Sequence, residues 1–181
     1  MPNTPWLRPV AAACLLATIA APGCASREPF CKVYPPEVAD PLLRSMMGTW
    51  HIDRSIRGEH VTNDMRVESV VDGAFIRMHM WSTTAGRPYQ AMVMVGRDEG
   101  KAGAAGEYVA HWCDSFGAGA SAIGRGTRTG DSIEFVFDYP DGPFYNTFTR
   151  LDADRWTFKG ESGRPDGTRS LFASDVVTRV K

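Results

Sequence analysis

The sequence predicts an all-β domain of about ten antiparallel strands that follow one another as a meander and close into a barrel, with a short helix before the first strand. From Gly48 onward, segments such as FIRMHMWS and SIEFVFDYP alternate in character with a period of two, which is typical of strands. Turn signals such as Asp72-Gly73 and Asp141-Gly142 separate these segments at nearly even spacing. No helix-length period lies between them, which excludes parallel βαβ units. Closure into a barrel removes the exposed edges that such a meander would otherwise have.

A short helix is predicted within residues 36–47. Leu42, Leu43, Met46 and Met47 recur there at helical spacing, and Pro41 suits a first helical turn. We expect this helix to plug one end of the barrel, and we place the boundaries of the barrel domain at residues 36–181.

Residues 1–23 are predicted to be an export signal. Arg8 precedes an apolar run over residues 10–21, which is too short for a permanent membrane span but suits a signal peptide. The tetrad that ends at Cys24, Ala-Pro-Gly-Cys, resembles a bacterial lipobox. It predicts a lipidated Cys24 and, because residue 25 is Ala rather than Asp, a lipoprotein on the periplasmic side of the outer membrane. The alternative is a soluble periplasmic or secreted protein, and in either case residues 24–35 are predicted to be a flexible tether.

Composition and charge limit the class of partner. The chain has 181 residues, 43% of them hydrophobic, and its 20 Lys and Arg residues nearly balance its 21 Asp and Glu residues. No basic excess is available for a phosphate backbone, so nucleic acid is not an expected partner. Outside the signal and Cys24, the cysteines are Cys31 and Cys113, which either form a disulfide in an oxidising compartment or remain two separate thiols. The oligomeric state stays open.

The segment Gly48-Thr49-Trp50, just after the predicted helix, resembles the G-x-W motif of the calycins, the group that includes lipocalins and fatty-acid-binding proteins. In that group the Trp closes the barrel floor, often beneath an Arg from the last strand, which makes Arg179 the corresponding residue here. The turn VVDGAF and the later segment WCDS extend the similarity to a bacterial calycin-like family of unknown function, over about residues 42–181. The resemblance implies a fold and structural roles for Gly48, Trp50 and Arg179, but no activity.

Haem, metal and catalytic sites are not predicted. The haem-binding nitrobindins resemble this chain in strand number and in G-x-W, but their W-x-G-x-G motif does not continue here and the last histidine is His111, far from their C-terminal axial ligand. His111 and Cys113 share one face of a strand and, with His79, form the only combination considered for zinc. Ser115 and Asp114 do not converge with His111 as a catalytic relay requires. We therefore predict no catalytic residue, no metal and no cofactor.

Binding is the function that the sequence favours. Small barrels of this type enclose an apolar cavity with a few polar groups. The predicted ligand-binding residues lie within or near the ends of strands: Arg77, Met78, His79, Met80, Met92, Met94, His111, Tyr139, Tyr145 and Arg150. An inward Arg77 or Arg150 would indicate a carboxylate ligand, whereas an outward Arg77 would place Met78 and Met80 inside.

We therefore expect non-catalytic binding or carriage of a small apolar or amphipathic molecule in the cell envelope. The alternatives are a solid structural or interaction barrel and an enzyme that acts within the cavity.

Overall fold

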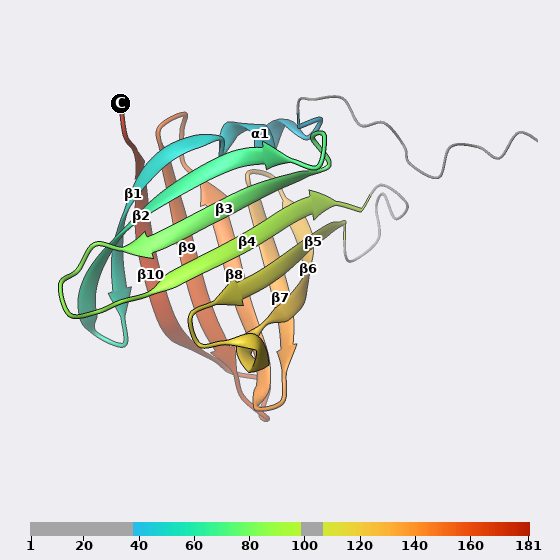
Figure 1. Cartoon of the computed structure of the whole chain (residues 1–181). Coiled ribbons are helices and arrows are strands. Elements are labelled where there is room, and N and C mark those ends of the chain that lie inside the picture. The colour runs from blue at the N-terminus through green and yellow to red at the C-terminus, as the bar shows by residue number, and fades with distance from the viewer. Residues whose placement is uncertain (1–37, 99–106) are drawn as a thin grey trace, which may run out of the picture. The chain divides into compact units, whose positions relative to one another are not determined.

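The computed structural model describes residues 38–98 and 107–181, which form a closed barrel of ten antiparallel strands (Figure 1). The strands are β1 (Gly48–Ile56), β2 (Glu59–Val70), β3 (Phe75–Ser82), β4 (Gln90–Arg97), β5 (Tyr108–Asp114), β6 (Ala122–Thr129), β7 (Ser132–Tyr139), β8 (Gly142–Arg150), β9 (Arg155–Gly163) and β10 (Arg169–Arg179). The predicted signal peptide, the tether, Cys24 and Cys31 lie outside the described residues.

Each strand pairs with its neighbours in the sequence, and β1 pairs with β10 to close the barrel. The closing register places Trp50 opposite Arg179 and Arg54 opposite Asp175. One irregularity, between Leu171 and Ala173, shifts the register where β10 pairs with β9. The predicted all-β meander and its closure are confirmed.

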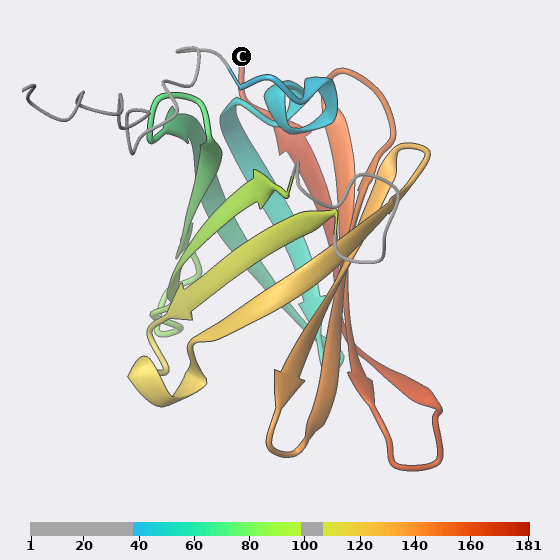
Figure 2. The same cartoon turned by 90° about the vertical axis from the view of Figure 1, so that its right-hand side faces the viewer.

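The helix is shorter than the predicted segment. α1 spans Pro41–Ser45 and begins after Asp40, whose carboxylate accepts hydrogen bonds from the backbone N–H groups of Leu42 and Leu43 at 2.9 and 3.0 Å. The other oxygen of Asp40 accepts a 2.7 Å hydrogen bond from the Tyr108 hydroxyl of β5, so the start of the helix is attached to the barrel wall. α1 lies across one end of the barrel (Figure 2), and no helix in the described part of the chain has the length and apolar character to cross a membrane.

The two ends of the barrel are filled differently. Near α1 the interior is packed with large side chains, among them Leu42, Met46, Trp50, Tyr108 and Trp156, each at most 2% exposed. Towards the opposite end, where the short helix η2 (Ala118–Ala120) joins β5 to β6, the strand interiors carry polar residues as well as aromatic ones. This opposite half contains the candidate site.

Candidate ligand-binding cavity

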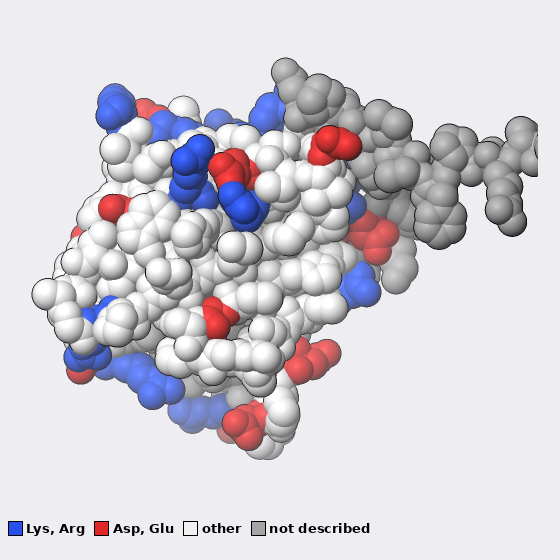
Figure 3. All heavy atoms as spheres, viewed as in Figure 1, with Lys and Arg blue, Asp and Glu red and all other residues white. Residues whose placement is uncertain are grey.

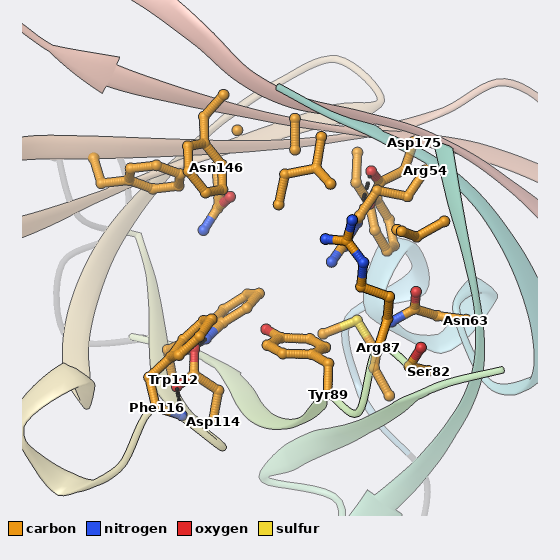
Figure 4. Close-up of a pocket in the computed structure, with 18 of the residues that line it drawn as sticks. Arg54, Asn63, Ser82, Arg87, Tyr89, Trp112, Asp114, Phe116, Asn146 and Asp175 are labelled. Atoms are coloured by element: carbon orange, nitrogen blue, oxygen red, sulfur yellow. Dashed lines mark hydrogen bonds and ion pairs between the residues drawn. The ribbon is translucent and has the colours of Figure 1, made fainter. Parts of the chain in front are cut away.

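A cavity of about 530 Å³ occupies the half of the barrel remote from α1. Its volume lies within the range of small-molecule sites. Aromatic side chains supply most of its apolar wall: Tyr89, Trp112, Phe116, Tyr139, Phe144, Phe148, Phe158 and Phe172. Figure 4 shows Trp112, Tyr89 and Asn146 arranged around one central opening, with Arg54 and Asp175 at its side.

A buried ion pair forms part of the wall. Arg54 on β1 and Asp175 on β10 are opposite each other in the register. The Arg54 guanidinium donates from Nε at 3.0 and 3.1 Å and from Nη2 at 2.6 Å to the Asp175 carboxylate, a bidentate arrangement. The two side chains are only 13% and 3% exposed. Burial raises the pKa of Asp175, although Arg54 opposes the change. Burial lowers the pKa of Arg54, but Asp175 and Tyr89 together outweigh it, so that this pKa is raised.

Two side-chain amides face the cavity without a partner. Asn63 on β2 is 2% exposed and Asn146 on β8 is half-buried, and both line the cavity. Within residues 38–98 and 107–181, neither amide makes a side-chain hydrogen bond. Each amide offers a carbonyl acceptor and two N–H donors, so the cavity presents unused hydrogen-bonding groups of both kinds.

The remaining charged groups lie nearer the open end. Arg87 pairs with Glu59 at 2.6 Å, whereas Lys159 pairs with Glu161 at 2.8 Å on the outer wall, where it lies opposite Ser174. Asp114 accepts hydrogen bonds from the Trp112 indole N–H at 3.1 Å and from the backbone N–H of Phe116 at 3.0 Å. In the described part of the chain, no cation pairs with Asp114, so its carboxylate leaves a negative charge at the mouth of the cavity.

The solved structures that this chain resembles share its fold. Neither protein-family models nor curated proteins include a match to this chain. The barrel resembles that of Rv2717c. This Mycobacterium tuberculosis protein superposes with a TM-score of 0.53 at 12% identity, over 78% of this chain and 99% of that one. A redesigned β-barrel, b11L5F_LGL, matches with a TM-score of 0.44 at 14% identity, over 77% of this chain and 96% of that one.

Tyr89 titrates well above the usual range of a phenol. Burial and the negative charge of Asp114 raise the pKa of Tyr89 to about 12, against the opposing influence of Arg54 and Trp112. We expect the ultraviolet difference titration between the wild type and Tyr89→Phe to show one phenol ionising near pH 12. A difference spectrum with a midpoint near pH 10 would contradict the buried position of this side chain.

Four of the ten predicted binding residues lie on the inward face of their strands. Met80 and Tyr139 line the cavity. Met78 faces the same interior, fully buried in the packed core, and does not reach the cavity. Arg150 is in phase with Phe148 and opposite the buried Trp156, but it lies at the α1 end of β8 and does not line the cavity. Its Nε donates a 3.2 Å hydrogen bond to the backbone carbonyl of Asp152.

The other predicted residues lie on the outer wall. Side chains alternate between the two faces of each strand, and the buried residues, such as Met78 on β3 and Val93 on β4, mark the inward face. The six predicted residues on the opposite face of β3, β4, β5 and β8 are Arg77, His79, Met92, Met94, His111 and Tyr145. Arg77 pairs with Glu68, and the Tyr145 ring lies 3.5 Å from the guanidinium carbon of Arg169. Figure 3 shows the outer face over β3 and β4 to be largely uncharged. Arg77 thus faces outward and Met78 and Met80 face inward, which is the second of the two alternatives, and Arg54 is the buried arginine of the cavity wall.

The combination considered for zinc lies on this outer face too. His111 and Cys113 share one face of β5, as the alternation predicts, but that face is exposed, and within the described residues Cys113 forms no disulfide. No group of three or more metal-ligating side chains occurs among the described residues. Whether Cys113 pairs with Cys31 or both remain separate thiols stays open, since Cys31 lies outside the described residues.

The residues of the G-x-W motif meet at the closed end. The guanidinium carbon of Arg179 lies 4.0 Å from the centre of the Trp50 ring. Its Nη1 and Nη2 donate to the carbonyls of Met47 and Ser45 at 2.7 and 2.9 Å. Arg179 therefore joins the end of the last strand to the segment that precedes the first one, on the side of the barrel remote from the cavity.

The sequence analysis did not predict three polar cavity residues that nevertheless follow a common sequence pattern: Arg54, Asn63 and Asp175. Arg54 stands two places after Ile52 and four after Trp50, and therefore shares their inward face. Asn63 precedes the buried Met65 by two places, and Asp175 precedes the buried Val177 by two. A polar residue in phase with a buried apolar series is the pattern that indicates such a position.

Proposed function

We propose that this barrel binds a small amphipathic molecule in the cavity opposite α1. The observation that carries the proposal is a cavity of about 530 Å³ in which the buried amide of Asn63 has no partner in the described structure. A buried amide without a hydrogen bond is costly, and protein interiors are otherwise closely packed. A bound molecule with a polar group would satisfy the amide and occupy the space.

The phenol of Tyr89 and the guanidinium of Arg54 are suited to binding rather than to proton transfer. The pKa of Tyr89 is raised to about 12, and that of Arg54 is raised above an already high value. Both groups therefore hold their protons at neutral pH, whereas a general acid or base works best with a pKa near the working pH.

Filling the cavity tests the proposal. Ala173 on β10 is 8% exposed and lines the cavity, while the adjacent Ser174 is exposed on the outer wall. We expect Ala173→Phe to abolish binding of the neutral fluorescent probe N-phenyl-1-naphthylamine, because the added ring takes up the space. Ser174→Phe adds the same ring outside and should leave the affinity unchanged. Equal binding by both variants would show that the probe binds elsewhere.

We propose further that the protein acts in the cell envelope as a lipoprotein. The support is the apolar run over residues 10–21 and the following Pro22-Gly23-Cys24. We expect the wild type, expressed in a bacterium that processes lipoproteins, to incorporate a palmitate analogue and Cys24→Ser to lose the label. An unlabelled wild type would leave the soluble periplasmic or secreted alternative.

A further inference from the structure

The cations that line the cavity are already neutralised. Arg54 pairs with Asp175 and Arg87 with Glu59, each with an N–O distance of 2.6 Å, whereas the Lys159 side chain lies on the outer wall opposite Ser174. Asp114 adds a carboxylate that has no cation partner in the described residues. With Glu59 counted as the partner of Arg87, these two ion pairs and Asp114 sum to one negative charge, and an anionic ligand would enter without a free cation to receive it.

The unused polar groups are uncharged. Asn63 and Asn146 each provide an acceptor and a donor, and Asn63, which is 2% exposed, is reached from the cavity. A carboxylate has no proton to donate and would satisfy only the N–H groups. A primary amide, a lactam or a similar group both donates and accepts, and matches both parts of an asparagine side chain.

A charged amine is a poorer match for the buried end. Asp114, the carboxylate without a cation, stands at the end of β5 near the open mouth and already accepts two hydrogen bonds. An ammonium group beside Asn63 would lose its hydration next to the guanidinium of Arg54, a like charge. The buried end therefore favours a neutral group.

Resting on the binding function proposed above, we infer that the ligand is an uncharged molecule with a flat apolar body and a polar group that both donates and accepts hydrogen bonds, and that the site rejects carboxylates. The flat body follows from the wall, where eight aromatic side chains surround the opening. Aromatic rings pack favourably against other flat rings in offset or edge-to-face arrangements.

Matched compounds test this ligand class at pH 7. Naphthalene, 2-naphthamide, 2-naphthoate and 2-(aminomethyl)naphthalene share one ring system and differ in the charge and hydrogen bonding of one group. In competition with N-phenyl-1-naphthylamine, we expect 2-naphthamide to bind most tightly, roughly tenfold more tightly than naphthalene, which is the size of one net buried hydrogen bond. We expect 2-naphthoate to be the weakest of the four.

Two variants assign the preference to particular residues. Asn63→Leu should lower the affinity for 2-naphthamide roughly tenfold and leave that for naphthalene unchanged. Asp175→Asn keeps the shape of the pair but frees the charge of Arg54, and should reverse the order so that 2-naphthoate binds more tightly than 2-naphthamide. Glu134→Gln is the control, because Glu134 forms a similar bidentate pair with Arg169 outside the barrel, at 2.7 and 3.2 Å. It should leave the order unchanged.

The outcomes separate the ligand class from the binding function. If the neutral probe binds in the cavity but 2-naphthoate or the amine outcompetes 2-naphthamide in the wild type, the inferred class is wrong and the binding function stands. An Asp175→Asn variant that folds, as judged by circular dichroism, and keeps the wild-type order would also overturn it. If neither the probe nor any of the four compounds binds, both proposals fail.

Discussion

Replacing Asp175 with alanine is expected to lower the free energy of unfolding by about 3 kcal/mol, because it leaves the guanidinium of Arg54 buried without its counter-charge. The Arg54 side chain is 13% exposed and all of its hydrogen bonds to Asp175 would be lost. The estimate is set at the lower end of the range for broken buried pairs because the adjoining cavity admits water, which can hydrate the freed cation. Urea unfolding followed by tryptophan fluorescence measures the difference.

Glu134→Ala is the matched control for this prediction. The Arg169–Glu134 pair has a comparable geometry, with a shortest distance of 2.7 Å, but its side chains are 37% and 38% exposed. Water screens such a pair, so its loss should cost less than about 1 kcal/mol. If both alanine variants lost similar stability, the Arg54–Asp175 pair would not be desolvated in the folded protein.

A double variant distinguishes the net contribution of the Arg54–Asp175 ion pair to stability from the cost of removing only one of its charges. Arg54→Met combined with Asp175→Leu removes both charges and fills the same region with apolar atoms. We expect it to be more stable than Asp175→Ala, because no unpaired charge remains. It should nevertheless change the ligand preference of the cavity, which would show that the pair is retained for recognition rather than for stability.

The path of the chain could be predicted because the sequence repeats one pattern. Turn residues recur at nearly even intervals and the segments between them alternate, so the number of strands and their closure follow. The Trp50–Arg179 contact follows from the G-x-W resemblance. The short helix lies within the predicted residues 36–47 but ends at Ser45, because the N–H groups of Met46 and Met47 bond three residues back, to the carbonyls of Leu43 and Arg44 at 3.1 Å each, and so close its last turn.

The cavity was harder to predict because its residues are polar and come from strands distant in sequence. β4 is apolar on both faces, so its alternation alone could not show that Val93 rather than Met92 points inward. Arg54 and Asp175 are separated by 121 residues and meet only because β1 pairs with β10. The register of that closing pair is set by the whole barrel, and no local pattern contains it.

Trp50→Ala is expected to have the largest effect on stability of any single change at the closed end, a loss of about 3–5 kcal/mol. The Trp50 side chain is 1% exposed, its indole N–H donates to the Met46 carbonyl at 2.7 Å, and Arg179 covers its ring. Removal of the indole leaves a cavity, frees the carbonyl and deprives Arg179 of its stacking partner. Since domains of this kind are stable by roughly 5–15 kcal/mol, the variant should be near the limit of folding.

Trp50→Phe provides a graded comparison for the same site. It keeps an aromatic ring beneath Arg179 but loses the hydrogen bond to Met46, so we expect a smaller loss of about 1–3 kcal/mol, measured by urea unfolding. Trp50 does not line the cavity, so this variant should bind N-phenyl-1-naphthylamine with the affinity of the wild type. A change in probe affinity at unchanged fold would mean that the packed end and the hollow end are coupled. Unchanged probe affinity with lowered stability would show that the closed end contributes to the stability of the fold without affecting binding in the opposite half.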